Sequence, residues 1–228
     1  MIKSTGRFNP QTNEELKFYY RPDTSDEKVL KEIFKNRCYR KPSIGFDVSE
    51  GETWIDLGGH IGLFALYAIS NGAKKVIVYE ADKDNFDILQ KNILLNNLTD
   101  VIIPIYSAVV ADDILGDDKT INLWKSKNPS VNYRNSIVEK SRGIKTIVPA
   151  IKFNSIIEEN IDGLKIDIEG AEVDILTSNS SNYQNIKKLT YEFTLSTGKI
   201  ELATTTLTEK QLTINIPPSY LKPSNWGW

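Results

Sequence analysis

A cluster of glycines between two acids is the part of this sequence with the clearest chemical meaning. The stretch WIDLGGHIGLFA (54–65) places Gly58, Gly59 and Gly62 shortly after Asp56, and Glu80 ends the next apolar run. Glycines let a backbone approach a ligand closely, and a helix that starts in such a loop presents free N–H groups. A carboxylate at the end of the next strand can accept hydrogen bonds from both hydroxyls of a ribose. The pattern therefore indicates a site for an adenosine-type ligand.

Leu57 bears on which adenosine ligand the loop fits. A dinucleotide fingerprint G-x-G-x-x-G ending at Gly62 needs glycine at position 57, where the tight turn meets the pyrophosphate. The pattern of Asp56, Gly58 and Gly62 instead suits a ligand with ammonium and sulfonium charges and no phosphate. The sequence therefore predicts S-adenosylmethionine as the cofactor. Two other classes stay open, an NAD(P)-dependent Rossmann oxidoreductase and a non-catalytic nucleotide-binding module.

Four further ionisable side chains could take part in a reaction. Asp167 and Glu169 lie at the end of the apolar run GLKIDIEG, Glu192 lies in KKLTYEFTL, and His60 is the only histidine. We expect Asp167 to contact the cofactor or the acceptor and Glu169 to be the second candidate for a catalytic base. Glu192 could bind an acceptor hydroxyl, and His60 is an available base near neutral pH. The competing structural roles are a helix cap for Glu169, an exposed charge for Glu192, and packing or a contact with the cofactor's methionine part for His60.

Three motifs resemble those of the FkbM-type methyltransferases: the glycine loop WIDLGGHIGLFA, VYEAD (78–82) and above all LKIDIEGAE (164–172). The resemblance spans roughly residues 26–195. It implies S-adenosylmethionine as the methyl donor and O-methylation of sugars or related hydroxylated metabolites. GGHIG and YEFT are also similar to methyltransferases that large algal viruses use on their glycans. His60 and Asn154 depart from the asparagine and aspartate usual in the family, and the histidine often found after Glu192 has no counterpart.

The candidate site residues fall into three sets. The cofactor-binding set expected from pattern and resemblance is Asp56, Gly58, Gly59, His60, Gly62, Glu80, Ala81, Ser107 and Asp167. An acceptor site, or only a solvated loop, could be formed by Trp124, Tyr133, Arg134 and Arg142. No metal site is expected, since turn-forming acids are commoner than cation ligands in a cluster such as Asp112, Asp113, Asp117 and Asp118.

Alternating strands and helices must position these residues. Strand patterns at 53–57, 74–80, 101–110, 163–170 and 187–195 are separated by helical patterns after the glycine loop, at 84–97 and at 171–179. This order predicts an α/β fold, a Rossmann-like class I methyltransferase with a mostly parallel twisted sheet, helices on both faces and an antiparallel edge. Residues 204–216 are expected to form an edge strand or a hairpin. Ligands then bind beyond the carboxyl ends of the central strands.

Three parts of the chain are expected. Residues 1–50 form an extension, with a strand at 16–20 and a helix at 25–36, that packs on the core. Residues 51–216 form the methyltransferase domain with an inserted loop at 111–146, in which two antiparallel strands flank a polar stretch. Residues 217–228 form a tail rich in proline and tryptophan.

Composition limits the classes of partner and the compartments that this protein is expected to have. The chain has 28 basic and 30 acidic residues among 228, so its field gives nucleic acid little reason to bind. Its single cysteine, Cys38, fits a reducing compartment, and no apolar stretch is long enough to span a membrane. We therefore expect a soluble cytoplasmic protein that does not bind nucleic acid, and the resemblance implies a carbohydrate acceptor. The oligomeric state is left open.

Overall fold

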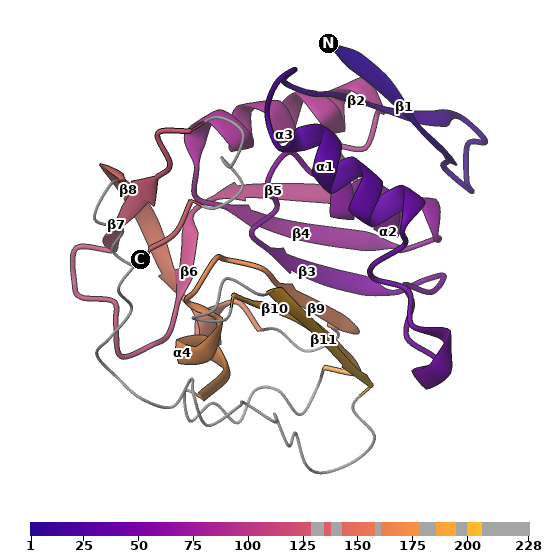
Figure 1. Ribbon diagram of the computed structural model, residues 1–228. Coiled ribbons are helices and arrows are strands. Elements are labelled where there is room, and N and C mark those ends of the chain that lie inside the picture. Colours follow the sequence, from indigo (N-terminus) through magenta and orange to yellow (C-terminus); the bar gives the residue numbers. More distant parts are fainter. Residues whose placement is uncertain (129–134, 138–142, 158–160, 178–185, 195–199, 207–228) are drawn as a thin grey trace.

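A six-stranded sheet forms the centre of the computed structural model, which describes residues 1–128, 135–137, 143–157, 161–177, 186–194 and 200–206. The strand order is β11-β10-β9-β3-β4-β5 (Figure 1). The strands are β3 (Thr53–Leu57), β4 (Lys75–Glu80), β5 (Ile102–Tyr106), β9 (Gly163–Ile166), β10 (Lys188–Thr194) and β11 (Ile200–Thr206). All neighbouring pairs are parallel except β10 and β11. The predicted α/β fold, a parallel sheet with one antiparallel edge, is confirmed.

Helices α2 (Leu63–Ser70) and α3 (Lys83–Leu95) cover one face of the sheet. Successive side chains of a strand point to opposite faces, so Trp54 packs with α2 in one core cluster while Ile55 belongs to the cluster on the other face. Helix α2 is apolar all round, and every residue from Leu63 to Ile69 is buried. This pattern is typical of a helix enclosed on all sides, here by the sheet and by the N-terminal segment.

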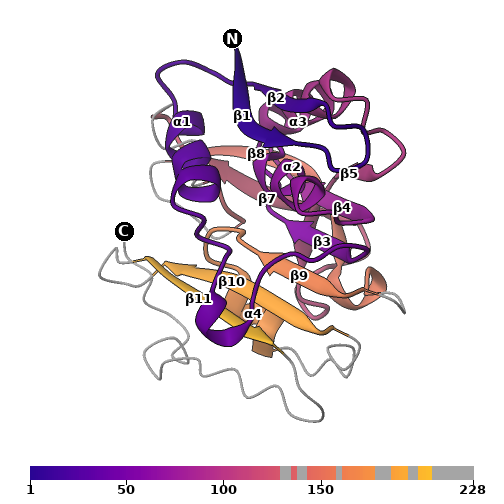
Figure 2. The same ribbon diagram turned by 90° about the vertical axis from the view of Figure 1, so that its right-hand side faces the viewer.

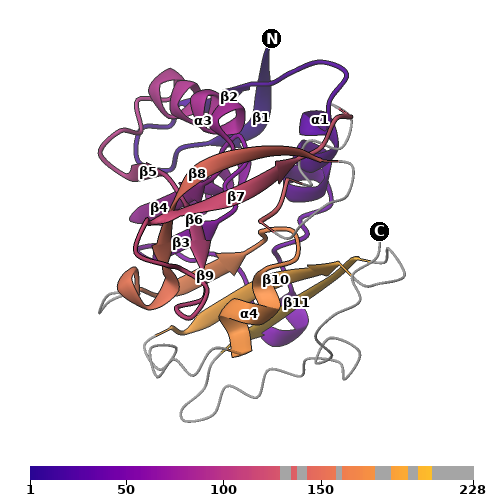
Figure 3. The same ribbon diagram turned by 90° about the vertical axis from the view of Figure 1, so that its left-hand side faces the viewer.

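The other face is covered by α4 (Glu172–Thr177), the short 3₁₀ helix η4 (Phe153–Ser155) and a second, three-stranded sheet (Figure 3). That small sheet has the order β6-β8-β7, with β6 (Ala108–Val110), β7 (Thr120–Lys125) and β8 (Ile144–Lys152). β7 and β8 are antiparallel, as predicted for the two strands of the insertion. Helices on both faces are likewise confirmed.

Two strand predictions need correction. The apolar run 101–110 is two strands, because the chain leaves the central sheet at Ser107, whose N–H donates to the Glu80 carbonyl (3.2 Å), and enters the small sheet as β6. Pro104 is tolerated in β5 because this strand lies at the sheet edge. The antiparallel edge strand begins at Ile200 rather than at residue 204, and residues 207–216 of the prediction lie outside the described part of the chain.

The N-terminal segment packs on the same face as α2 and α3 (Figure 2). It consists of β1 (Ile2–Phe8), β2 (Glu15–Tyr19), α1 (Asp26–Leu30), the π-helical turn η1 (Lys31–Lys35) and the 3₁₀ turn η2 (Pro42–Ile44). Its side chains Leu16 and Phe18 are fully enclosed in one core cluster with α2 and β4. The helix predicted at 25–36 is present as α1 and η1. Residues 217–228, the predicted tail, lie outside the described ranges.

Strand β2 is joined to α3 by two asparagine side chains. Asn92 exchanges hydrogen bonds with the N–H (2.5 Å) and the carbonyl (3.3 Å) of Tyr19, and Asn96 does the same with Lys17 (2.8 and 2.7 Å). Two residues along a strand advance about 6.6 Å and four along a helix about 6 Å, so the two spacings match. The two amide side chains therefore make the backbone hydrogen bonds that a neighbouring strand would make.

No helix in the described ranges is both long and apolar enough to cross a membrane.

Candidate active site at the carboxyl ends of β3, β4 and β9

A pocket opens where β3, β4 and β9 end, the place expected for a ligand in an open α/β sheet. The pocket and the solvent-filled space at its mouth together measure about 870 Å³. Most of the predicted site residues line it: Gly58, Gly59, His60, Glu80, Ala81, Ser107, Asp167 and Glu169. Asp56, Gly62 and Glu192 do not belong to the pocket wall.

The glycines of the loop are required by the protein itself. A Cβ on Gly58, which has φ +81°, would lie 1.8 Å from the carbonyl oxygen of Asp167. A Cβ on Gly59 would lie 2.1 Å from Cγ1 of Val78, and one on Gly62 would lie 2.5 Å from Leu89. From the sequence we expected these glycines to let a ligand approach the backbone closely. In the structure they let the loop pass close to β9, β4 and α3, which brings the strand ends together around the pocket.

Glu80 is held by two backbone N–H groups. Its Oε2 accepts from His60 and its Oε1 from Asp82, each at 2.7 Å. Burial raises the pKa of this carboxyl to about 7, against the lowering effect of those backbone hydrogen bonds. The side chain of Asn85 is a third hydrogen-bond partner, and since a carboxylate has about four acceptor positions, one remains for a hydroxyl of a ligand. Glu80 thus fits the predicted role at a ribose.

Asp56 is paired with a buried lysine and does not face the pocket. Nζ of Lys165 lies 2.8 Å from Oδ1 of Asp56, 3.1 Å from the carbonyl oxygen of Gly58 and 3.7 Å from Oδ2 of Asp167. Burial lowers the pKa of Lys165, but the carboxylates of Asp56 and Asp167 more than offset it, so the pKa is raised and the ammonium stays charged. We expected the charge of Asp56 to contribute to cofactor binding. In the structure this charge pairs with Lys165 and joins β3 to β9.

The turn after β9 is organised by Glu172, a residue that the sequence interpretation did not assign. Its carboxylate accepts from the N–H groups of Ile168 and Gly170, both at 2.8 Å, and burial raises its pKa to about 7. Glu169 has φ +60° in this turn and lines the pocket beside Asp167. The signal that could have found Glu172 is its spacing in IEGAE, where a carboxylate can reach back to close a turn.

Glu192 lies on β10 next to this turn. Tyr191 is opposite Ile166 in the parallel register, so the following residues, Glu192 and Asp167, are also neighbours. Burial and the carboxylates of Asp167 and Glu169 raise the pKa of Glu192 to about 9. Its side chain is half-buried, so the alternative of a fully exposed strand-end charge does not hold.

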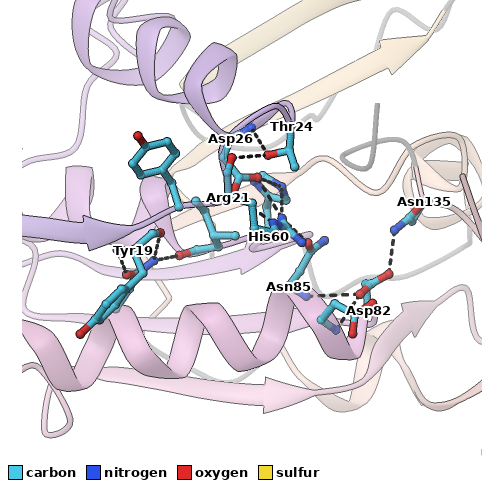
Figure 4. Close-up of polar contacts among 12 residues, drawn as sticks. Tyr19, Arg21, Thr24, Asp26, His60, Asp82, Asn85 and Asn135 are labelled. Carbon is cyan, nitrogen blue, oxygen red and sulfur yellow. Dashed lines mark hydrogen bonds and ion pairs between the residues drawn. The ribbon is translucent and has the colours of Figure 1, made fainter. Parts of the chain in front are cut away.

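His60 is held from both ends. Its backbone N–H binds Glu80, and its ring Nε2 lies 3.3 Å from both Oδ1 of Asp26 and Nη2 of Arg21 (Figure 4). Arg21 also donates to Oδ1 of Asn85 (2.8 Å), a pocket-lining residue in the first turn of α3. Sequence reasoning missed Arg21, Asp26 and Asn85 at this site because the contacts join segments far apart in the chain.

The insertion contributes one wall of the pocket. Asp82, the N-cap of α3, accepts from Nδ2 of Asn135 (2.7 Å) and is paired with Nζ of Lys125 (2.9 Å). The hydroxyl of Ser136 donates to the carbonyl oxygen of Glu169 (2.5 Å). Asn135 and Ser136 both line the pocket, so this segment bridges the ends of β4 and β9.

Of the predicted acceptor residues, Trp124 is the one that lies in the described ranges. Trp124 lies on β7 with Nζ of Lys145 5.9 Å from its ring centroid, and it is not part of the pocket wall. Tyr133, Arg134 and Arg142 lie outside the described residues. Within the acidic cluster, Asp112 accepts a hydrogen bond from the N–H of Asn154 (3.3 Å). The other three acids of the cluster are exposed.

Sequence comparison places the chain among methyltransferases. The family model described as "Methyltransferase FkbM domain" matches residues 56–208. A protein called Methyltransferase 1 from Beauveria bassiana (strain ARSEF 2860) is 25% identical over 224 residues, which covers 86% of this chain and 85% of that protein.

Solved structures with a similar fold include a methyltransferase FkbM from Methylobacillus flagellatus KT, with 16% identity and a TM-score of 0.43 over 75% of this chain and 45% of that one. Another is the tRNA (uracil-54, C5)-methyltransferase of Pyrococcus abyssi in complex with S-adenosylhomocysteine, with 10% identity and a TM-score of 0.42 over 78% of this chain and 32% of that one. This chain thus spans less than half the length of either structure.

The matched family region begins at Asp56 and includes the end of β3, the glycine loop, β4 and the β9 turn, which line a large part of the pocket. The buried carboxyl of Glu80 fits a ribose, and the resemblance seen in the motifs is confirmed over this region. The chain therefore belongs to the methyltransferase FkbM domain family, and its methyl donor is S-adenosylmethionine.

Proposed function

We propose that this methyltransferase acts on oxygen, and that its acceptor is a sugar hydroxyl of a glycan or glycan precursor. The observation that carries the proposal is the distribution of carboxylates around the glycine loop. Glu80 lies at the end of β4 on one side, whereas Asp167 and Glu169 follow β9 on the other. Carboxylates accept hydrogen bonds from hydroxyls, so one side can hold a ribose and the other an acceptor sugar.

Under this proposal the side of the pocket near β4 binds adenosine. Glu80 accepts from a ribose hydroxyl, while Ala81, Asn85 and Ser107 line the surrounding wall. The backbone from Gly58 to His60 lies beside the methionine part. Bound there, S-adenosylmethionine supplies an electrophilic methyl group. Asp56 and Gly62 act indirectly, by holding the loop in its observed shape.

The proton of the acceptor hydroxyl has to leave as its oxygen gains the methyl group, and we assign its removal to Asp167. This carboxylate lines the pocket and is held near the ammonium of Lys165. A base in this position typically contributes about 10²–10⁴-fold to the rate. Glu192, with its pKa raised to about 9, keeps its proton at neutral pH and lies beside Asp167, outside the pocket wall. Glu169 and His60 stay the alternative bases.

Apolar side chains in the pocket wall exclude water from the reaction. Val29, Ile33 and Tyr39 from the N-terminal segment line it together with Leu63 and Phe64 of α2. Holding an acceptor oxygen in line with the transferred group can supply about 7–11 kcal/mol of the barrier reduction.

The near balance of 28 basic and 30 acidic residues favours a sugar over a nucleic acid as acceptor. A cytoplasmic location stays a prediction.

The experiment that tests the proposal uses S-adenosylmethionine with a labelled methyl group and a panel of glycans, sugar nucleotides, RNA and protein. A mass gain of one methylene unit on a sugar is the expected result. Label in RNA or protein but not in any sugar would overturn the acceptor class. Asp167→Asn should lower kcat about 10²–10⁴-fold. Asp113→Asn, a change of an exposed acid outside the pocket, is the matched control.

A further inference from the structure

The N-terminal segment lies next to the glycine loop although it precedes the matched family region. Residues 15–39 come before Asp56, where the family match begins, yet Val29, Ile33 and Tyr39 line the pocket. Figure 4 shows the polar side chains that join this segment to the loop and to α3. The pocket is therefore not built by the family region alone.

Arg21 and Asp26 form the centre of this contact. The side chain of Asp26 is fully buried, and its carboxylate accepts from the backbone N–H (2.8 Å), Nε (3.1 Å) and Nη2 (2.9 Å) of Arg21. Burial raises the pKa of Asp26, but hydrogen bonds from His60 and Arg21 more than offset it and hold the pKa well below its usual range. Asp26 is thus a fixed negative charge behind the loop.

Arg21 and Asp26 contact the pocket-lining residue His60, and Arg21 also contacts Asn85. His60 has φ +50°, a left-handed conformation that costs a non-glycine residue about 1–3 kcal/mol unless its surroundings hold it there. Contact of its ring with Asp26 and of its backbone with Glu80 holds it from both ends. With Nε2 of His60 facing Asp26, the buried Nδ1 has no hydrogen-bond partner among the described residues. Nε2 faces both an acceptor, Asp26, and a donor, Arg21, so the tautomer of His60 decides whether Nδ1 accepts or donates.

A third link joins the same segments behind the loop. Nδ2 of Asn92 donates to the carbonyl oxygen of Ile61 (2.7 Å) and to that of Tyr19 (3.3 Å), so one side chain contacts both the glycine loop and β2. A shift of the N-terminal segment would therefore move the loop at Ile61 as well as at His60. Contacts made at both positions fix the loop's orientation as well as its place.

We propose that Arg21 and Asp26 are positioning residues of the cofactor pocket, which act through His60 and Asn85. The N-terminal segment then helps to set the affinity for S-adenosylmethionine. This inference rests on the proposed placement of the cofactor's methionine part beside Gly58 and His60.

The test measures binding of S-adenosylhomocysteine by calorimetry, together with the thermal midpoint, in four variants of the full chain. Asp26→Asn removes the charge, and Arg21→Met removes the donors. Arg21→Lys keeps the charge but not the forked geometry. Asn96→Ala is the matched control, because it breaks the same junction of β2 with α3 at the Lys17 end, on the side away from His60.

Asp26→Asn and Arg21→Met should each weaken S-adenosylhomocysteine binding about 10-fold or more, as expected for loss of a hydrogen bond to a charged group. Arg21→Lys should recover part of the loss. Asn96→Ala should lower the thermal midpoint but leave the dissociation constant within about 2-fold, because the Asn96 side chain bonds to Lys17 and to the Asn92 backbone and touches neither Arg21, Asp26 nor His60. If Asp26→Asn does not fold, Arg21→Lys still decides the question, since it changes only the geometry of the contact.

The outcomes separate the two claims. A wild-type chain that does not bind S-adenosylhomocysteine would overturn the proposed function. A wild-type chain that binds, with unchanged dissociation constants in the Arg21 and Asp26 variants, would overturn the positioning role, and so would equal weakening by Asn96→Ala. A spectroscopic readout is independent of these, because His60 is the only histidine. Its ring signals should shift when ligand binds the wild type, and shift less in Asp26→Asn.

Discussion

At the scale of single residues, the proposed contact of Glu80 with the ribose links proton binding to cofactor binding. Its carboxyl has a pKa of about 7, raised by burial, and its proposed role is to accept a hydrogen bond from a ribose hydroxyl. The ionised form is the better acceptor, so affinity for S-adenosylhomocysteine should fall as the pH drops below 7. Glu80→Gln should weaken binding about 10- to 100-fold, the loss of one charge-assisted hydrogen bond.

Calorimetry at pH 6, 7 and 8 checks this prediction on the wild type and the variant. The pH dependence should be present in the wild type and absent in Glu80→Gln. A wild-type affinity that does not change over this range would contradict the assignment of Glu80 to the ribose.

Residue types and order along the chain were enough to predict part of this site. Gly58, Gly59, His60, Glu80 and Asp167 line the pocket as expected. The partner of Asp56 was not predicted, because Lys165 reaches it across two strands that are 109 positions apart in sequence. Arg21 and Asp26 were missed for the same reason. A sequence pattern identifies groups that chemistry requires, but it does not show which of them a neighbouring strand neutralises.

At the scale of elements, the fit of the glycine loop against β4 depends on Gly59. A Cβ there would lie 2.1 Å from Cγ1 of Val78, so Gly59→Ala should overpack the site and destabilise the fold by about 1–3 kcal/mol. Val78→Ala removes the obstructing methyl groups. Denaturant unfolding should show the double variant Gly59→Ala/Val78→Ala losing less than the sum of the single changes. Strict additivity would show that the two residues do not compete for this space.

The junction of β3 with β9 depends on the pair formed by Asp56 and Lys165. Lys165→Met leaves a buried carboxylate without its cation, which typically costs about 3–5 kcal/mol. Adding Asp56→Asn removes that charge, so the double variant should regain part of the unfolding free energy. Equal stability of Lys165→Met and the wild type in denaturant unfolding would show that this pair does not stabilise the junction.

The elements themselves were the most predictable part of the structure. Apolar runs and helical spacing located β3, β4, β9 and both large helices, because burial on both faces of a parallel sheet leaves a strong signal. The break at Ser107 was not predicted, since 101–110 is apolar throughout and only the neighbouring elements decide which sheet each half joins. The three-part division of the chain stays a prediction.

At the scale of the whole molecule, three carboxyls with raised pKa values, two of them buried and one half-buried, set the pH dependence of stability. The pKa values of Glu80 and Glu172 are raised to about 7 and that of Glu192 to about 9 by burial and, for Glu192, by neighbouring carboxylates. The folded state therefore holds these protons more tightly than the unfolded state. Their stabilising effect is complete below the unfolded pKa of about 4.3 and is lost as the pH rises through 7 and 9.

Denaturant unfolding of the ligand-free protein should thus give a lower unfolding free energy at pH 8 than at pH 5.5, by a few kcal/mol, since one unit of pKa shift corresponds to about 1.4 kcal/mol. Addition of S-adenosylhomocysteine should reduce the difference, because binding favours the ionised form of Glu80. A higher stability at pH 8 without ligand would contradict the raised pKa values.

The amides of Asn92 and Asn96 have a consequence for self-association. An exposed strand edge is a template on which another chain can pair, but the inner edge of β2 is already occupied by these two side chains. Growth of the N-terminal ribbon by intermolecular pairing is thus confined to β1. There, the register shifts between Ser4 and Phe8, and such an irregularity disfavours the addition of another strand. The helix α3, which lines a binding pocket at one end, thus also occupies the edge of β2 on which another chain could pair.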